Sequence, residues 1–124
     1  MLKYKKRELL MTIAEDLTMP NKKIIKIVKE LNKLIREQFK DFRGLYLYGS
    51  QASGTFHKDS DIDVVAIFDE TSWEKTFELG GILGDLMYKY DMYIDLHPYT
   101  PETIKRNPIY YNEVVNKGIY YEAA

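Results

Sequence analysis

Apolar side chains recur at steps of three and four residues along residues 21–40, and this spacing predicts an amphipathic helix. Such a helix turns one apolar face toward the core and leaves its polar side chains in solvent. Residues 2–17 are only loosely periodic, and a short helix is expected there. The apolar positions of the predicted 21–40 helix are Ile24, Ile25, Ile27, Val28, Leu31, Leu34, Ile35 and Phe39.

Short apolar runs predict strands further along the chain. Residues 45–48 and 61–68 are two such runs, and residues 92–97 alternate between apolar and polar side chains. Because successive side chains of a strand point to opposite faces, Asp95 faces away from the apolar side of the third strand. A short edge strand is expected over residues 119–121.

Capping signals predict two further helices. A Thr-Ser-Trp-Glu capping box opens a helix over residues 71–90. Three glycines lie within it, each costing up to ~1 kcal/mol relative to Ala. They predict either a break near Gly80 or a very close approach of the helix to the sheet. Thr100 as the cap and Pro101 as the first residue open a last helix, which ends before Gly118.

The order of these elements predicts an α/β fold with a small mixed sheet flanked by helices. At 124 residues the chain is long enough for one domain with a proper core and too short for two. We expect an N-terminal helical extension over residues 1–20 and one compact domain over residues 21–124. Between the first two strands, residues 50–60 predict a turn with at most one helical turn.

Composition indicates an ordinary globular protein, with 45% hydrophobic and 30% charged residues. The absence of cysteine excludes a disulfide framework and a thiolate nucleophile. No apolar run approaches the ~20 residues that span a membrane, and a cytoplasmic location is expected. Residues 1–43 hold twelve Lys and Arg against six Asp and Glu, and the remainder holds six against thirteen. This asymmetry favours a solvated basic helix face over a nucleic-acid or acidic-partner surface.

The most informative stretch joins the first two predicted strands. Gly49-Ser50 closes the first apolar run, and Asp61-Ile62-Asp63 opens the second. Residues i and i+2 of a strand point to the same face, so Asp61 and Asp63 project together. Paired carboxylates suit Mg²⁺, which is commonly held by one or two carboxylates and substrate phosphates. A Gly-Ser turn can bring bare backbone N–H groups up to a phosphate chain.

This spacing resembles the Gly-Ser…Asp-x-Asp signature of the DNA polymerase β-like nucleotidyltransferase superfamily. Within it, the chain is similar to the small stand-alone members called minimal nucleotidyltransferases (MNT). The resemblance runs from about Ile24 to Tyr121, which is nearly the whole chain. It implies the polymerase β-like nucleotidyltransferase fold for the domain.

The resemblance also implies roles for individual residues. Asp61 and Asp63 would bridge two Mg²⁺ ions, and Asp95, on the neighbouring strand, would hold the second ion and lower the pKa of the attacking hydroxyl. Gly49 and Ser50 would contact the β- and γ-phosphates of ATP, the substrate.

The chain departs from the family pattern at two positions of this site. The family has an Arg where this sequence has Ser53, and often another basic residue where it has Gln51. Two phosphate-facing cations are therefore missing, and Lys58 is the candidate replacement. A solvated loop lysine is an equal alternative for Lys58.

The small relatives act as antitoxins of HEPN-family ribonuclease toxins. The resemblance therefore implies a protein adenylyltransferase that moves AMP from ATP to a tyrosine of a HEPN-type toxin and neutralises it. No membrane partner is expected, and either a homo-oligomer or a hetero-oligomer with the toxin fits the sequence.

Two alternatives stay open at this point. One is a nucleotidyltransferase that acts on a small molecule such as an aminoglycoside, which an acceptor pocket built by dimerisation would favour. The other is a catalytically weak antitoxin that masks its toxin by binding, which the missing arginine at Ser53 would explain.

Overall fold

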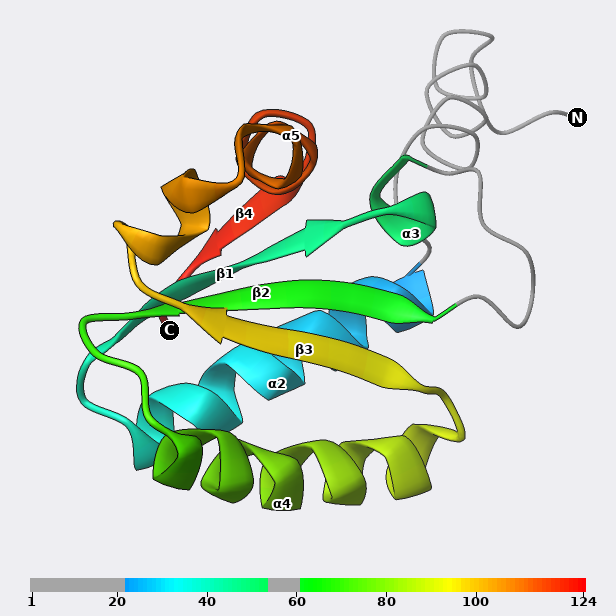
Figure 1. The fold of residues 1–124 in the computed structure, drawn as a ribbon. Helices are drawn as coiled ribbons and strands as arrows, with labels where there is room; N and C mark the ends of the chain where they lie inside the picture. Colours follow the sequence, from blue (N-terminus) through cyan, green and yellow to red (C-terminus); the bar gives the residue numbers. More distant parts are fainter. Residues whose placement is uncertain (1–21, 54–60) are drawn as a thin grey trace, which may run out of the picture.

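A four-stranded mixed sheet forms the centre of the molecule (Figure 1). The computed structural model describes residues 22–53 and 61–124, so the expected N-terminal extension lies outside the described residues. The spatial order is β3-β2-β1-β4; β1 is antiparallel to β2 and to β4, whereas β2 and β3 are parallel. The small mixed sheet flanked by helices is confirmed. The strands are β1 (Phe42–Tyr48), β2 (Ile62–Phe68), β3 (Ile94–Tyr99) and β4 (Ile119–Glu122).

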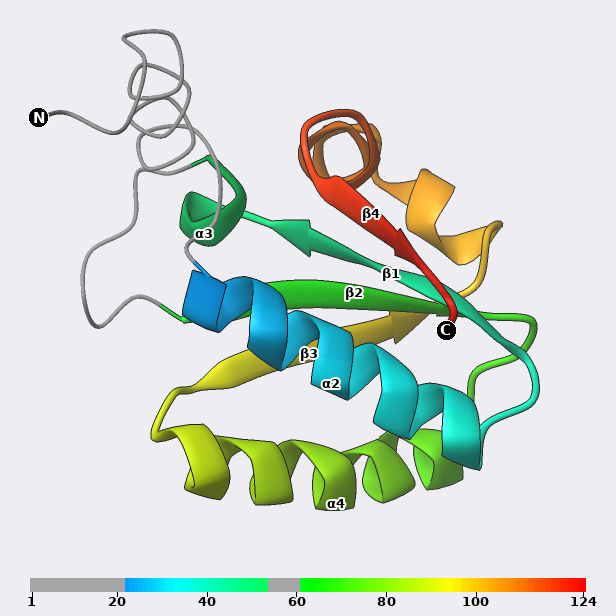
Figure 2. The same ribbon diagram turned by 180° about the vertical axis from the view of Figure 1, so that it is seen from behind.

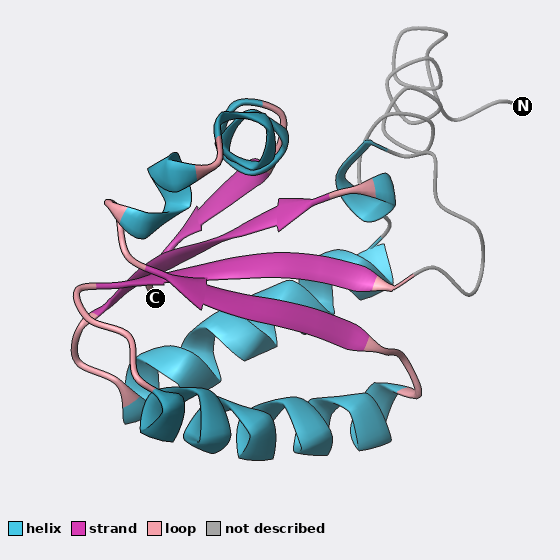
Figure 3. Ribbon diagram, in the orientation of Figure 1, coloured by secondary structure: helices cyan, strands magenta, loops and turns pink. Residues whose placement is uncertain are grey.

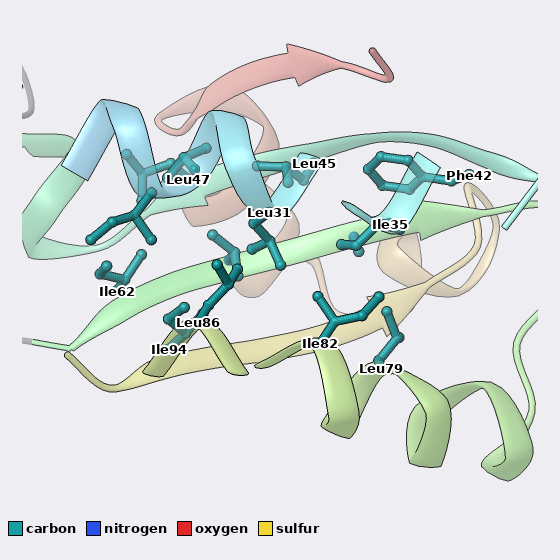
Figure 4. Close-up of a cluster of buried hydrophobic side chains, with 14 of the residues drawn as sticks. Leu31, Ile35, Phe42, Leu45, Leu47, Ile62, Leu79, Ile82, Leu86 and Ile94 are labelled. Carbon is teal, nitrogen blue, oxygen red and sulfur yellow. The ribbon is translucent and has the colours of Figure 1, made fainter. Parts of the chain in front are cut away.

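The two long helices, α2 (Lys22–Gln38) and α4 (Trp73–Tyr90), cover one face of the sheet (Figures 2 and 3). Their apolar faces meet the inward side chains of β1, β2 and β3 in the main core. Figure 4 shows this cluster, in which both helices and all three strands contribute aliphatic side chains. Its labelled members are Leu31, Ile35, Phe42, Leu45, Leu47, Ile62, Leu79, Ile82, Leu86 and Ile94.

The buried stripe of α2 includes one polar side chain, Asn32, which is only 5% exposed. Its amide Nδ2 donates to the carbonyl of Glu122 at 2.8 Å, and its Oδ1 accepts from the backbone N–H of Ala124 at 3.0 Å. A buried polar group is costly unless it is hydrogen-bonded. Asn32 therefore ties the chain at β4 to the first helix of the domain.

The third strand begins two residues later than the sequence predicts, at Ile94 rather than residue 92. It also extends through Pro98, which has no N–H to donate to a neighbouring strand. β3 lies at the edge of the sheet, where this missing donor costs nothing. The alternation pattern therefore predicted correctly which side chains of β3 share a face, but it placed the ends of the strand wrongly.

The predicted break in α4 is wrong, because the helix runs without interruption from Trp73 to Tyr90. Ser72 is its N-cap and accepts a hydrogen bond from the backbone N–H of Lys75 at 3.1 Å. The predicted close approach of the glycines to the sheet is also wrong. Gly80, Gly81 and Gly84 are exposed, and a Cβ added at any of them would meet only open space.

The single last helix predicted after Pro101 is likewise wrong. The chain forms the 3₁₀ turn η1 (Thr103–Arg106), the short helix α5 (Pro108–Tyr111) and the π-helical turn η2 (Asn112–Asn116). Pro108 disfavours helical backbone in the residue before it, and Asn107 is extended. Thr100 does cap the first turn, since its Oγ1 accepts from the N–H of Thr103 at 3.1 Å.

These short helical segments cover part of the second face of the sheet (Figure 1). Beneath them lies a small second core of Val65, Ile67, Ile104 and Val114, bordered by several tyrosines. No helix in the described ranges 22–53 and 61–124 is long and apolar enough to cross a membrane.

Gly118 joins η2 to β4 and allows a close backbone contact. A Cβ built there would lie 2.1 Å from the carbonyl oxygen of Val114 and 2.9 Å from that of Leu47. We expect Gly118→Ala to lower the free energy of unfolding by about 1–3 kcal/mol, because backbone atoms must shift to admit the methyl group. Gly81→Ala, at an open helix position, is the control and should raise it slightly. Equal denaturant midpoints for Gly118→Ala and the wild type would contradict this packing.

Candidate active site

Two carboxylates stand side by side on the second face of the sheet. Asp63 of β2 lies opposite Asp95 of β3 in the parallel register. Residues paired in this way share a face, and here it is the face away from α2 and α4. Asp61 directly precedes β2 and is exposed; the period of two places it on the side of Asp63. The pairing that alternation alone could only suggest is thus fixed by the register of β2 and β3.

The electrostatic environment of Asp63 disfavours its charged form. Partial burial is the largest cause that raises the pKa of Asp63, and the negative charges of Asp95 and Asp61 raise it further. His97 acts in the opposite direction and lowers this pKa. A bound cation would relieve the repulsion among these carboxylates.

The Gly49-Ser50 turn lies directly against this pair. Tyr48, the last residue of β1, is paired with Asp63, so the turn follows at the same end of the sheet. Gly49 has φ +75°, and a Cβ there would lie 2.6 Å from Oδ2 of Asp63. Only glycine combines this conformation with this close approach. Ser50 then opens the short helix α3 (Ser50–Ser53).

Two further positions were named from the sequence, Ser53 and Lys58. Ser53, which stands where the family pattern has Arg, is exposed at the end of α3, and its Oγ donates to the carbonyl of Ser50 at 3.2 Å. Lys58, the predicted replacement cation, lies outside the described residues.

A pair of tyrosines, Tyr48 and Tyr110, borders the carboxylates. The hydroxyl of Tyr48 is 2.8 Å from that of Tyr110, and the two rings meet edge to face. Burial is the main cause that raises the pKa of both phenols. Both therefore stay protonated at neutral pH, and since one hydroxyl hydrogen joins the pair, the other remains able to donate elsewhere. The pairing of Tyr48 with Asp63 puts this phenol on the face of the carboxylates, and only the tertiary fold brings Tyr110 to it.

His97 also belongs to the site, although a histidine in such a strand is more often a surface residue. Its Nε2 lies 3.0 Å from Oδ1 of Asp95, and both side chains are about half exposed. The two residues are separated by two positions on β3 and therefore share a face. His97 thus restrains the Asp95 carboxylate at the open side of the pair.

The donor set fits a hard divalent cation that is shared with phosphate oxygens. Within the described residues, no three acidic or histidine side chains converge closely enough to enclose a metal ion by themselves. Mg²⁺ needs no such enclosure, because it commonly takes one or two carboxylates and completes its shell with water and substrate phosphates. The paired carboxylates of Asp63 and Asp95, which lie beside the Gly49-Ser50 turn, meet that requirement.

The chain and its fold have relatives among known proteins. Residues 21–121 match the family model described as a nucleotidyltransferase domain. A protein of Methanocaldococcus jannaschii, provisionally named a protein adenylyltransferase, is 33% identical over 89 residues, which are 68% of this chain and 90% of that protein.

Solved structures share the fold at lower identity. A chain in the crystal structure of a toxin–antitoxin complex with AMP-PNP has a TM-score of 0.56 at 23% identity, covering 77% of this chain and 69% of that one. A chain in the complex of a tri-AMPylated Shewanella oneidensis HEPN toxin with its MNT antitoxin has a TM-score of 0.53 at 19% identity, covering 78% and 70%. Identities this low establish the fold alone.

The raised pKa of Asp63 predicts how the stability of the fold depends on pH. Because the folded state holds this proton more tightly than the unfolded state, the free energy of unfolding falls as pH rises through the titration of Asp63. In EDTA at pH 7, Asp63→Asn should therefore melt higher than the wild type, by roughly 1–3 °C. The difference should vanish near about pH 3, where the carboxyl is protonated in both states.

Scanning calorimetry from pH 3 to pH 8 would measure this difference. Asp85→Asn, an exposed acid on α4, is the matched control and should show little change. A lower melting temperature for Asp63→Asn at pH 7 in EDTA would contradict the repulsion described above.

Proposed function

Because the chain belongs to the nucleotidyltransferase domain family, we propose that it transfers AMP from ATP to a tyrosine hydroxyl of a HEPN-type partner protein and thereby neutralises that protein. The observation that carries the proposal is the Asp63–Asp95 pair in direct register beside the Gly49 turn. Paired carboxylates for Mg²⁺ and a glycine turn for phosphates are the two parts that nucleotidyl transfer needs.

The reaction exchanges one bond at the α-phosphorus for another. The tyrosine oxygen forms a bond to that phosphorus, the bond from the α-phosphorus to the oxygen bridging to the β-phosphate breaks, and pyrophosphate leaves. The hydroxyl proton passes to solvent. The product is a phosphodiester that adds one negative charge to the partner for each AMP. Negative charge on a ribonuclease opposes the approach of RNA phosphates.

Asp61, Asp63 and Asp95 are the residues that would hold Mg²⁺. When two ions are bound, they supply the charge that stabilises the attacking and leaving oxygens. The remaining contribution of the chain is positioning: His97 restrains Asp95, and the Tyr48–Tyr110 pair offers a neutral hydroxyl donor beside the carboxylates.

The phosphate chain of ATP is proposed to lie against the Gly49-Ser50 turn. Gly49 brings its backbone close to Asp63, and Ser50 adds a hydroxyl at the start of α3. Lys58 is the proposed cation for the terminal phosphates. Ser53 contributes no charge, and slower transfer than in relatives with an Arg at that position is the expected consequence.

A protein acceptor is supported by two kinds of likeness. The Methanocaldococcus jannaschii relative is provisionally named a protein adenylyltransferase. Two of the structures that share the fold are toxin–antitoxin complexes, one with an ATP analogue and one with a tri-AMPylated HEPN toxin. These likenesses favour a protein acceptor over a small molecule.

The central test is nucleotidyl transfer by variants of the carboxylates. We expect Asp63→Asn and Asp95→Asn each to lower the rate of transfer by at least about 100-fold, because an amide provides no anionic oxygen for Mg²⁺. The assay follows label from α-³²P-ATP into a co-purified HEPN-type protein, with the mass of the modified peptide as confirmation.

Asp91→Asn is the control for this assay. Asp91 occupies a left-handed backbone position at the end of α4, which Asn tolerates well, and its variant should retain full activity. Retention of more than a few per cent of activity by Asp63→Asn would exclude the proposed role of that carboxylate.

Ligand binding gives a second test that does not require the acceptor. Mg²⁺ with ATP at about 100 times the dissociation constant should add about 2.7 kcal/mol to the free energy of unfolding, whereas ATP in EDTA should add far less. Thermal unfolding of the wild type and of Asp63→Asn would measure both effects. Equal shifts with and without metal would mean that the carboxylates take no part in binding ATP.

A further inference from the structure

The helix α4 has a second apolar face on the side that points away from the sheet (Figure 1). With about 100° between successive residues, its buried residues Leu79, Ile82 and Leu86 occupy one side. On the opposite side of the helix, a stripe about 100° wide along the helix axis holds only aromatic residues and glycines. We call this stripe the outer face of α4; its members are Trp73, Phe77, Gly80, Gly81, Gly84 and Tyr88.

The aromatic side chains of the outer face are unusually accessible. Trp73 is 74% exposed, Phe77 is 77% exposed and Tyr88 is 93% exposed. Single exposed apolar residues are ordinary, but a contiguous apolar patch is typical of an interaction site. Trp and Tyr are also the residue types that most often dominate the binding energy of interfaces. The outer face thus has the composition of a docking surface.

The glycines of the outer face also support a docking role. Each glycine inside a helix costs up to ~1 kcal/mol relative to Ala, and a Cβ at Gly80, Gly81 or Gly84 would meet nothing in this chain. Packing within the domain therefore does not require them. A flat backbone between Phe77 and Tyr88 would let the backbone of another helix approach closely.

Charge identifies the kind of helix that fits. Glu74, Glu78 and Asp85 are exposed and form a row along one edge of the outer face. The two cations of α4 are engaged elsewhere, Lys75 with Asp41 and Lys89 with Glu30. A partner helix with Lys or Arg along the matching edge would complete this row.

A second copy of this chain does not provide that complement. If two α4 helices packed antiparallel about a two-fold axis, the acidic row of each would lie on the same side and face the other. If they packed parallel, each acidic row would face the uncharged edge that includes Thr76 and Met87. Neither arrangement places a cation opposite the acidic row, so charge complementarity favours a different protein.

We propose that the outer face of α4 binds an amphipathic helix of the protein that accepts the nucleotidyl group, with Lys or Arg bordering the apolar side of that helix. This inference rests on the proposed function. The position of α4 is consistent with it, since its C-terminal end lies at the end of the sheet where β3 begins with Ile94 and Asp95 (Figure 1). The outer face and the carboxylates lie on opposite sides of the sheet, so a partner held along α4 would reach the carboxylates around the edge formed by β3.

The test uses the full chain and the acceptor, defined as the protein that α-³²P-ATP labels. Phe77→Ser should weaken binding of the purified acceptor at least 10-fold by calorimetry and raise its KM, while leaving the Mg²⁺–ATP melting shift unchanged. Ile109→Ser is the matched control, because Ile109 is 80% exposed but lies on α5, and it should bind normally.

Gly84→Ala separates docking from folding. The added methyl group has open space in the isolated chain, so the melting temperature should rise. The same methyl group should weaken acceptor binding, because it holds the partner helix away. If Gly84→Ala destabilised the fold, both the melting temperature and acceptor binding would fall. If it blocks the docking surface, the melting temperature rises while acceptor binding falls.

Three outcomes would be decisive. Weaker binding by Phe77→Ser and Gly84→Ala, with a higher melting temperature for the latter, supports the inference. Unchanged binding of a labelled acceptor by both variants overturns it and leaves the proposed function standing. Self-association that Phe77→Ser abolishes, seen by analytical ultracentrifugation, also overturns it in favour of a second copy. Absence of any labelled protein with the wild type is instead the failure of the proposed function.

Discussion

The parallel pairing of β2 with β3 is the constraint on which the rest of the structure depends. Parallel neighbours cannot be joined by a tight turn, so the chain needs a crossover, and α4 supplies it. The crossover places α4 beside α2 on one face of the sheet. The same pairing puts Asp63 directly opposite Asp95 on the other face. One register therefore determines both the main core and the carboxylate pair.

The site holds negative charges close together although they repel one another. Asp63 is partly buried beside two other carboxylates, and Gly49 is held in a left-handed conformation against it. Such arrangements persist because the surrounding sheet and core fix them. The apolar strand residues Ile62 and Val64, on either side of Asp63 in sequence, are fully buried and anchor the carboxylate that they flank.

The fold and the site were predictable from the sequence wherever a residue's environment is set by its near neighbours in the chain. The period of 3.6 in α2 and the alternation in β2 and β3 gave the elements and the faces of Asp63 and Asp95. The resemblance gave the fold, but the roles assigned to the site residues all stay predictions: Asp61, Asp63, Asp95, Gly49, Ser50 and Lys58. The contact of Tyr48 with Tyr110 joins segments 62 positions apart, and no local pattern encodes it. The glycines of α4 misled because their cost has no explanation within the domain. Pro108 divided a segment that the capping signals at Thr100, Pro101 and Gly118 had predicted to be one helix.

The return of the chain to β1 through β4 has a consequence for how the protein folds. β4 pairs with a strand more than seventy positions earlier, Leu45 with Tyr121, and Asn32 fastens the same end across 90 positions. Contacts of such long separation form late, since loop closure must precede them. Tyr110 lies on α5, within the segment that this return holds in place. The Tyr48–Tyr110 pair therefore depends on this return of the chain, whereas the pairing of Asp63 with Asp95 does not involve it.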